Sequence, residues 1–467
     1  MPFDPPLIVK KTRVLFCVSH INFWLQLEAV GDELAQRGHD VTVLFDHKKS
    51  WKFDHRFHWK ADGKKYAVGF LQDRYDKIGR VAESLREAIN YLSYFSDKRA
   101  PFNAVLADRW TEHVSTAYWR LFHWHRVCRW LTWPPIFCLL RNIANSAPLF
   151  PAIVDDLLNR KPDLVVTVPT LLPHSLEYEY LRTAERLGFP TAIIVPSWDN
   201  LTTKGIFHLV PDKIFVWNEA QIREARDIFD IPPARLYATG APRYDRWFHL
   251  KSSRTREQFC AEAGLDPKRP FFVWLCSSNF IANEEEAVVQ DAAQAVSASI
   301  GWQKAGAQLL VRPHFQNLKT WTTSSQEGKS ALNLWPRPDS LESFDPEQMH
   351  QDFYDTLAHC AGVIGLNTSA FLEASIVDRP CMTLLDSRFE ATQSGLPHFE
   401  HLVRGGFLMA AKTPEELIDH LKTILDGKDP LASARRNFVK HFLRPGGPAR
   451  NASEILADGL EALAKSN

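Results

Sequence analysis

The chain has 467 residues, of which 45% are hydrophobic and 24% charged, with 55 basic and 55 acidic side chains. This length exceeds what one hydrophobic core usually supports, so the sequence predicts two domains. The zero net charge provides no global field that would attract nucleic acid, and we expect no nucleic-acid partner. Seven scattered cysteines without a C-x-x-C pair argue against a disulfide framework or a zinc cluster and favour a reducing cytoplasm.

The first half alternates short apolar runs with amphipathic helical segments, a pattern typical of a parallel sheet. A strand at 14–18, a helix ending at Gly38 and a strand at 40–45 form one βαβ unit. This unit has no G-x-G-x-x-G, so the dinucleotide fingerprint is absent. Further strands are expected at 163–168, 191–195, 213–217 and 236–239.

A mostly helical insertion at about 73–160 interrupts this alternation and mixes tryptophan with arginine. Such a segment favours a membrane interface or an anionic glycan, whereas rings packed on the sheet are the alternative. The N-terminus lacks an apolar signal core and no stretch is long enough to span a bilayer. We therefore expect a cytoplasmic protein, with a peripheral contact at the inner face of the membrane. The residues expected to make that contact are Trp110, Trp119, Trp124, Arg126, Arg129 and Trp130.

The α/β pattern starts again near residue 250, with strands expected at 271–276, 307–311, 362–366 and 380–385. The predicted fold class is therefore α/β, with two Rossmann-like domains facing a cleft, where ligands usually bind. The predicted domains are residues 1–250, which carry the insertion, and residues 251–448. A terminal helix at 449–467 is expected to cross back to the first domain.

Three polar segments follow strands of the second domain, and the carboxyl ends of parallel strands share one edge of a sheet. Arginine and histidine supply positive donors, serine and threonine supply hydroxyls, and a helix start supplies free N–H groups, which together suit a diphosphate. A carboxylate one turn into that helix suits a ribose diol. The predicted nucleotide-binding residues are Ser277, Ser278, Arg312, His314, Asn367, Thr368, Ser369 and Glu373. A salt bridge for Arg312, and an N-cap followed by a solvated Glu373, are the alternatives.

Two residues of the first domain follow strands and suit proton transfer. His20 comes after the first strand, and an ordinary histidine pKa of about 6.5 suits a general base near neutral pH. Asp199 has the equivalent place after a later strand. A loop-capping histidine and an Asx-type turn are the alternatives, and a retaining transfer would require neither residue as a base.

Three segments carry a resemblance to GT-B glycosyltransferases, which covers most of the chain in its layout. Arg312-Pro313-His314 is similar to the Arg-x-His-Pro element of Kdo-transferase and CDP-glycerol glycerophosphotransferase relatives, although proline precedes histidine here. The segment 367–373 resembles the serine-plus-acid element that binds phosphate and nucleoside in those relatives. The segment 239–245 is similar to the Gly-x-Pro-x-x-Asp sequence that ends their N-terminal domain. The chain also resembles uncharacterised bacterial proteins of surface-polysaccharide gene sets.

The resemblance implies transfer of a sugar from a nucleotide-activated donor to a cell-surface polysaccharide or a lipid-linked glycan. The nucleotide sugar would be a substrate, so no cofactor is expected, and the lack of Asp-x-Asp predicts no metal. Three alternatives remain open: a polyol-phosphate transferase of the CDP-glycerol kind, a UDP-sugar 2-epimerase, and a non-catalytic glycan-binding protein. The epimerase would require acidic residues crowding the sugar.

Overall fold

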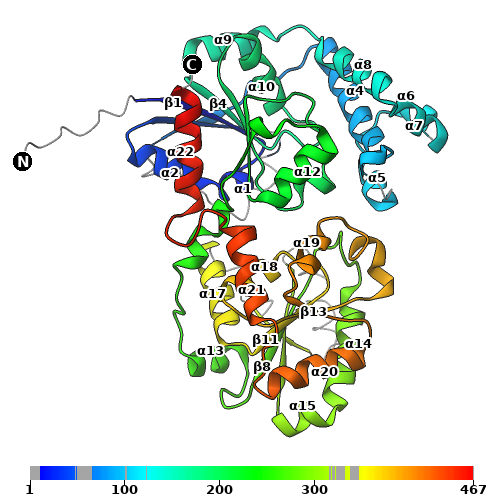
Figure 1. Ribbon diagram of the computed structural model, residues 1–467, viewed down its shortest axis with the longest axis vertical. Coiled ribbons are helices and arrows are strands. Elements are labelled where there is room, and N and C mark those ends of the chain that lie inside the picture. The colour runs from blue at the N-terminus through cyan, green and yellow to red at the C-terminus, as the bar shows by residue number, and fades with distance from the viewer. Residues whose placement is uncertain are drawn as a thin grey trace, which may run out of the picture. The chain divides into compact units, whose positions relative to one another are not determined.

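The computed structural model describes residues 11–47, 49, 66–99, 103–122, 124–314, 317, 321, 332–336 and 346–465. The chain divides into two compact units (Figure 1). Unit 1 comprises Met1–Arg243 and Phe442–Asn467, and unit 2 comprises Tyr244–His441. The boundary therefore falls somewhat before the expected residue 250. Each unit is an α/β fold around a parallel sheet, which confirms two Rossmann-like domains, while the cleft between them stays a prediction.

Unit 1 is built on a seven-stranded parallel sheet in the described residues, with the order β3-β2-β1-β4-β5-β6-β7. Its strands are β1 (Arg13–Val18), β2 (Asp40–Phe45), β3 (Ala67–Phe70), β4 (Leu164–Val168), β5 (Thr191–Ile194), β6 (Lys213–Val216) and β7 (Leu236–Ala238). Helices cover both faces of this sheet. They are α1 (Ile21–Trp24), α2 (Glu28–Gln36), α9 (Pro151–Arg160), α10 (Glu177–Arg186), α11 (Asn200–Thr203), α12 (Glu219–Phe229) and the 3-10 turn η2 (Pro233–Arg235).

Burial on both faces explains why the inner strands are continuous apolar runs. In β1, Phe16 packs into the core on the side of α2, and Leu15 and Cys17 pack on the side of α9 and α10. A parallel sheet sandwiched between helices leaves no polar face on its central strands.

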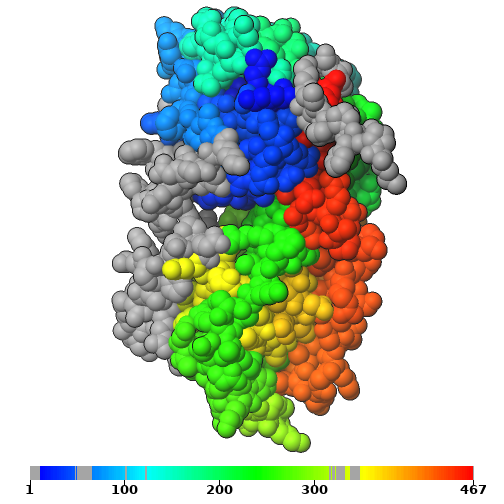
Figure 2. Space-filling model, turned by 90° about the vertical axis from the view of Figure 1, so that its left-hand side faces the viewer, coloured from blue at the N-terminus to red at the C-terminus, as the bar shows by residue number. Residues whose placement is uncertain are grey.

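The C-terminal helix α22 (Ala452–Lys465) completes the core of unit 1 beside α2, as Figure 1 shows. Leu456 and Leu460 are fully buried there. Arg37 at the end of α2 donates to Asp458 at 2.7 Å and to Glu461 at 2.9 Å. The C-terminal segment (red) lies directly beside N-terminal residues (blue) in Figure 2.

The insertion consists of helices between β3 and β4 (cyan and light blue in Figure 1). They are α4 (Lys77–Ser93), η1 (Asp97–Arg99), α5 (Ala104–Thr111), α6 (Thr116–Phe122), α7 (His125–Leu131) and α8 (Pro134–Asn145). The long helix α4 connects the insertion to the rest of unit 1 through a buried amide. Asn90 Oδ1 accepts the backbone N–H of Ile206 at 3.0 Å and contacts His208 Nε2 at 3.0 Å.

Unit 2 has a six-stranded parallel sheet in the described residues, with the order β10-β9-β8-β11-β12-β13. Its strands are β8 (Phe271–Leu275), β9 (Gln308–Arg312), β10 (Asn333–Leu334), β11 (Gly362–Gly365), β12 (Cys381–Leu384) and β13 (Leu408–Ala411). Its helices are α13 (Arg256–Ala263), α14 (Glu285–Ala298), α15 (Ile300–Ala305), α17 (Pro346–His359), α18 (Ala370–Ile376), α19 (Phe399–Arg404), α20 (Pro414–Leu425) and α21 (Ala432–Phe438). The turns η3 (Pro242–Phe248), η6 (Ser387–Thr392) and the π-helical η7 (Val439–Leu443) complete the elements.

The strand order of each sheet reverses beside its first strand. The chain moves outward from β1 to β3 and then returns to add β4 on the other side of β1. In unit 2 the same reversal separates β8 from β11. Open α/β sheets bind ligands outside the carboxyl ends of their strands at such a switch point. The loops after β1, β4, β8 and β11 are therefore where function is expected.

Candidate functional site

A pocket of about 410 Å³ lies at the carboxyl edge of the sheet of unit 1. It contains residues that follow β1, β2 and β4, so it lies at the β1/β4 switch point, and helix α4 of the insertion closes one side. Charged groups of both signs line it. The lining residues are His20, Asp46, Lys49, Asp73, Arg74, Gly79, Glu83, Arg86, His174, Ser175, Leu176 and Glu179.

His20 lines this pocket and also caps helix α1. Its Nδ1 accepts the backbone N–H of Asn22 at 3.2 Å, and its ring lies 4.4 Å from the ring of Phe23. Burial, assisted by the charge of Lys49, lowers the pKa of His20 to about 4, so the imidazole is neutral at pH 7. Since the cap uses the Nδ1 lone pair, the neutral ring carries its proton on Nε2. In this tautomer Nε2–H of His20 is a donor group, and a base role requires the other tautomer.

His174 and Glu83 form a second candidate for proton transfer in the same pocket. His174 Nδ1 lies 2.9 Å from Glu83 Oε1, and the backbone N–H of His174 donates to Glu87 Oε1 at 2.9 Å. The bond to Glu83 raises the pKa of His174, and the same bond lowers the pKa of Glu83. With Nδ1–H held by a carboxylate, Nε2 of the neutral ring is the acceptor, which is the arrangement a general base needs. His174 also has a φ of 52°, a left-handed conformation that non-glycine residues adopt infrequently.

The amino-acid sequence gives no sign of this pair. Glu83 lies on a helix of the insertion and His174 in the loop after β4, 91 residues away. No local motif links the two residues, and only the folded position of α4 brings them together.

Two further glutamates, both in the first turn of α10, have different roles. Glu179 is 3% exposed and accepts hydrogen bonds from Arg74, Arg86 and Arg182 at 2.8–2.9 Å. It therefore stays ionised and holds the insertion against α10. Glu177 is fully buried in the first turn of α10, and burial raises its pKa to about 7, although the charge of Lys49 opposes this.

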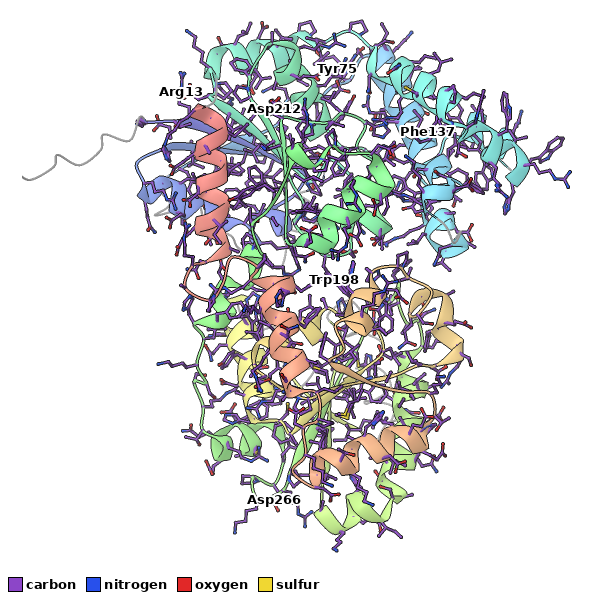
Figure 3. The ribbon with its side chains drawn as sticks, viewed as in Figure 1. Arg13, Tyr75, Phe137, Trp198, Asp212 and Asp266 are labelled. Carbon is purple, nitrogen blue, oxygen red and sulfur yellow. The ribbon has the colours of Figure 1, made fainter. Side chains whose placement is uncertain are left out.

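Asp199 does not line the pocket that contains His20. It lies at the start of α11, after the loop that holds Trp198, which Figure 3 labels. Its carboxylate accepts the hydroxyl of Ser197 at 2.6 Å and that of Thr203 at 3.0 Å. These bonds connect Asp199 to both sides of the loop after β5, and its catalytic role stays a prediction.

The predicted nucleotide-binding segments of unit 2 end on one edge of its sheet, because β9, β8 and β11 are adjacent and parallel. At the β8/β11 switch point, the Ser277 hydroxyl accepts the backbone N–H of Asn367 at 3.4 Å. The Asn367 side chain donates to the Thr392 carbonyl at 3.2 Å. Both residues are buried, whereas Ser278 is half-buried and Ser369 is exposed. Ser277 and Asn367 therefore shape the edge, and the exposed hydroxyls are the groups accessible to a ligand.

Glu285 supports this edge and was not anticipated as a site residue. Its carboxylate accepts the backbone N–H of Ser277 at 2.6 Å and Nε1 of Trp274 at 3.1 Å. The residue is 2% exposed, and burial raises its pKa to about 7. It holds the turn after β8 in place from the first turn of α14.

Arg312 forms a buried ion pair instead of projecting freely from the edge. It donates to Asp352 at 2.8 Å and to the Thr356 hydroxyl at 3.3 Å. Asp352 also accepts from Arg254 at 2.7 Å. Burial lowers the pKa of His314 to about 4, so this residue is neutral at pH 7. The positive charge expected from Arg312 and His314 is thus balanced by Asp352 or absent at neutral pH.

The segment 367–373 contains one exposed and one buried polar side chain. Ser369 is exposed at the N-cap of α18, while Glu373 is buried, at 8% exposed. Glu373 is therefore not the solvated glutamate of the alternative given for this segment. Thr368 Oγ1 accepts the N–H of Ala370 at 3.3 Å. The role of Glu373 toward ribose stays a prediction.

The tryptophans expected at a membrane fall into two groups. Trp110 is 3% exposed and its Nε1 donates to the hydroxyl of Tyr94 at 2.8 Å. Trp119 is half-buried, with its ring 5.8 Å from that of Tyr91. Trp110 is therefore corrected from surface to core, and Trp119 is partly covered by the insertion itself. Trp124, Arg126, Arg129 and Trp130 are exposed.

Among the residues that the structure describes, no cluster of three or more His, Cys, Asp or Glu side chains is placed to hold a metal ion.

Comparisons with known proteins place the fold. No protein-family model matches the sequence, and no curated protein matches it. The solved structure of a glycosyltransferase from Rickettsia africae is similar to this chain, with a TM-score of 0.53 and 9% sequence identity. The match covers 98% of this chain and 100% of the Rickettsia chain. The UDP-GlcNAc 2-epimerase from Methanocaldococcus jannaschii is similar with 12% identity, 95% and 98% coverage, and a TM-score of 0.52.

These similarities extend over both units of the chain. Because the sequence identities are this low, the similarities indicate a shared fold only. The protein has the two-domain architecture called GT-B, which glycosyltransferases and UDP-GlcNAc 2-epimerases share. Placement in the Kdo-transferase or CDP-glycerol branch stays a prediction.

Proposed function

We propose that this protein is a glycosyltransferase that moves a sugar from a nucleotide-activated donor to a hydroxyl of a cell-surface polysaccharide or lipid-linked glycan. The observation that carries the proposal is the pocket at the β1/β4 switch point, in which Glu83 holds His174 with its Nε2 as acceptor. An acceptor hydroxyl must lose its proton as the new glycosidic bond forms, and an oriented neutral imidazole is suited to take it. Neither a metal ion nor a cofactor is part of the proposal.

The two histidines of the pocket have different proposed tasks. His174 accepts the proton, and Glu83 is a positioning residue that fixes the tautomer and stabilises the imidazolium. His20 donates its Nε2 proton to a substrate oxygen, or becomes the base originally expected of it if its cap on α1 opens. Asp199 supports the neighbouring loop after β5.

The nucleotide is proposed to bind the β8/β11 edge of unit 2. Ser278 and Ser369 offer hydroxyl groups there, and the buried pair of Ser277 and Asn367 fixes the turns that carry them. Thr368, also proposed for the nucleotide, is buried and caps the start of α18 through its hydroxyl. His314 adds a neutral imidazole at the end of β9, and Glu373 is the proposed partner of the ribose. Arg312 contributes by holding α17 through Asp352.

A UDP-sugar 2-epimerase is the second candidate, and the acidic lining of the pocket favours it. Asp46, Asp73 and Glu83 all line the pocket that contains the histidines. Epimerisation at a sugar carbon requires groups that remove and return a proton, so carboxylates close to the sugar suit it. Such an enzyme would act on the nucleotide sugar without an acceptor.

One experiment separates these functions. Thermal shift assays with UDP, GDP, CDP and CMP would identify the nucleotide, and the matching nucleotide sugar would then be incubated with and without glycan acceptors. Nucleotide release that depends on an acceptor is expected for a glycosyltransferase, and an isomeric nucleotide sugar formed without an acceptor would identify an epimerase. Binding of glycans without turnover would identify a binding protein, and glycerophosphate transfer from CDP-glycerol would identify the polyol-phosphate transferase.

The variant His174→Gln tests the role of the pocket in the same assay. The kcat is expected to fall at least about 100-fold, since general-base catalysis commonly contributes that much. His441→Gln, at an exposed histidine of unit 2, is the matched control and should leave kcat unchanged. Unchanged turnover in His174→Gln would contradict the proposed base.

A further inference from the structure

The end of the insertion exposes large apolar side chains on two consecutive helices. They are Trp124 (71% exposed) at the start of α7, Trp130 (62%), Trp133 (59%) between α7 and α8, and Leu139 (57%) and Ile143 (51%) on α8. Leu139 and Ile143 are one helical turn apart and therefore share a face. We call these five residues, together with Arg126 and Arg129, the insertion surface.

The helices that carry this surface are well anchored on their other side. Phe137, which Figure 3 labels, packs with Leu140 and Ala144 of α8 around Ile89 and Ile206. Cys128 of α7 is fully buried. The inner side chains of α7 and α8 thus pack against the rest of the insertion, and their outer apolar side chains remain exposed. A surface of this kind on an otherwise ordinary protein usually marks an interaction site.

The charge of this region has one sign. The sequence contains no aspartate or glutamate between Glu112 and Asp155. Arg120, Arg126 and Arg129 are exposed in the same stretch. Arg129 lies 3.4 Å from Asp97, but both side chains are largely exposed, and pairs of that kind contribute little. The insertion surface therefore combines aromatic rings with an excess of positive charge.

We propose that the insertion surface docks this protein onto an anionic lipid bilayer. Tryptophan rings favour the headgroup level, and arginine stems lie along apolar surface while the guanidinium groups reach lipid phosphates. In the part of the chain that the structure describes, no helix has the length and apolar character needed to cross a membrane. The contact is therefore interfacial, with α7 and α8 lying in the plane of the bilayer.

A second copy of the chain fits this surface less well than a bilayer does. A two-fold interface brings two copies of the same patch together, so Arg126 and Arg129 of both copies would lie in one contact. Gathering like charges in this way opposes association. An anionic bilayer instead complements the arginines and accepts the tryptophans in one contact. This inference does not depend on the proposed function.

The test is flotation of the full chain with vesicles. Binding is expected to vesicles of phosphatidylcholine mixed with phosphatidylglycerol, to weaken at high salt, and to be absent with phosphatidylcholine alone. The double variant Arg126→Glu/Arg129→Glu should reduce partitioning at least about tenfold, since each basic residue near such a surface contributes on the order of 1 kcal/mol. The triple variant Trp124→Ser/Trp130→Ser/Trp133→Ser should lose binding through the apolar contribution alone.

Matched controls come from elsewhere on the surface. Arg223 and Arg226 have the same spacing on α12, and both are exposed, so Arg223→Glu/Arg226→Glu should bind vesicles like the unmodified protein. Ile300→Ser removes a side chain that is 83% exposed on unit 2 and should also have no effect. The proposal would be overturned if the wild-type protein did not float with anionic vesicles, or if the variants of the insertion surface bound them like the wild type. Light scattering that shows a dimer lost in the tryptophan variant would also overturn it, in favour of contact between copies.

Discussion

The hydrogen bond between Glu83 and His174 makes a pH-dependent prediction at the scale of single residues. Glu83 favours the protonated imidazole and so raises the pKa of His174. In Glu83→Gln this pKa should fall toward its ordinary value of about 6.5. An NMR titration of the His174 ring protons measures the change directly. In a turnover assay, the loss of activity on the acid side should move to lower pH in the variant.

The bond between Glu83 and His174 also contributes to the free energy of unfolding, and this contribution depends on pH. Because the folded pKa of His174 is raised, the contribution is complete below the ordinary pKa and is lost as the pH rises through the folded value. Glu219→Gln changes an exposed glutamate on α12 and is the control, with no expected effect on His174. If Glu83→Gln leaves the His174 titration unchanged, Glu83 does not orient the imidazole.

Asp352 carries a prediction about stability. It is 2% exposed and accepts from Arg254, Arg312 and Nε1 of Trp335. Asp352→Asn removes the charge that faces two arginines, and breaking a buried ion pair from one side costs about 3 kcal/mol. The measurement is the free energy of unfolding in urea.

The exposed pair of Asp291 with Arg388 provides the comparison for Asp352. Asp291 is 68% exposed, and Asp291→Asn should change the free energy of unfolding by less than about 0.5 kcal/mol. Equal small effects of both substitutions would mean that Arg312 is held only weakly. Arg312 would then be available to a diphosphate, as the sequence suggested.

At two glycines within helices, replacement by alanine is expected to change the free energy of unfolding differently. In helices, Gly→Ala usually stabilises by about 0.5–1 kcal/mol. At Gly459 of α22, however, a Cβ would lie 2.5 Å from Cε1 of Phe215, whose ring is in the core. Gly459→Ala should therefore destabilise unit 1 by about 1–3 kcal/mol, because α22 must move away from the sheet.

Gly301 of α15 is the matched control for Gly459. A Cβ there meets its nearest neighbour, Cγ of Lys422, at 3.8 Å, which is ordinary contact. Gly301→Ala should leave the free energy of unfolding unchanged or raise it slightly. Urea unfolding of both variants tests the pair. A stabilising Gly459→Ala would show that α22 is not held closely against β6.

The elements differ in how well the sequence reveals them, for physical reasons. Central strands such as β1 and β8 are buried on both faces, so apolar runs mark them. The edge strand β3 has only four residues, Ala-Val-Gly-Phe, and is mostly exposed. Its apolar run is short and contains a glycine, which weakens a strand pattern, and the strand was not anticipated. Helix α14 begins after Glu284, which has a left-handed φ of 65°, and Glu285 in its first turn binds the turn after β8, a contact that leaves no local signal in the sequence.

The site was predictable only where chain order determines position. Loops after neighbouring parallel strands must share an edge, which placed Ser277 beside Asn367. Partners from distant elements leave no local signal, and both Asp352 for Arg312 and Glu83 for His174 are of that kind. Composition also could not distinguish buried Trp110 from exposed Trp130. In a helical segment where tryptophan and arginine alternate, tryptophans occur on both the buried and the exposed face.

At the scale of the whole molecule, unit 1 is assembled from both ends of the chain. β1 is among its central strands, and α22 closes the same core after the chain has passed through all of unit 2. Unit 2 is consequently an uninterrupted segment, Tyr244–His441, whose core can form from local sequence. Unit 1 becomes complete only when the last helix is available. The two units therefore have separate cores that can unfold in separate steps.

Calorimetry of the full chain tests this division together with the proposed nucleotide site. Two unfolding transitions are expected, of which Gly459→Ala should lower the one that belongs to unit 1 and Asp352→Asn the one that belongs to unit 2. A nucleotide bound at the β8/β11 edge should raise the melting temperature of the unit 2 transition only. At a concentration 100-fold above its Kd, it should increase the free energy of unfolding of unit 2 by about 2.7 kcal/mol. If the nucleotide instead raises the transition that Gly459→Ala lowers, it binds the charged pocket beside His20 and His174. The donor assignment of Ser278, Thr368 and Ser369 would then be wrong, while the division into two cores would stand.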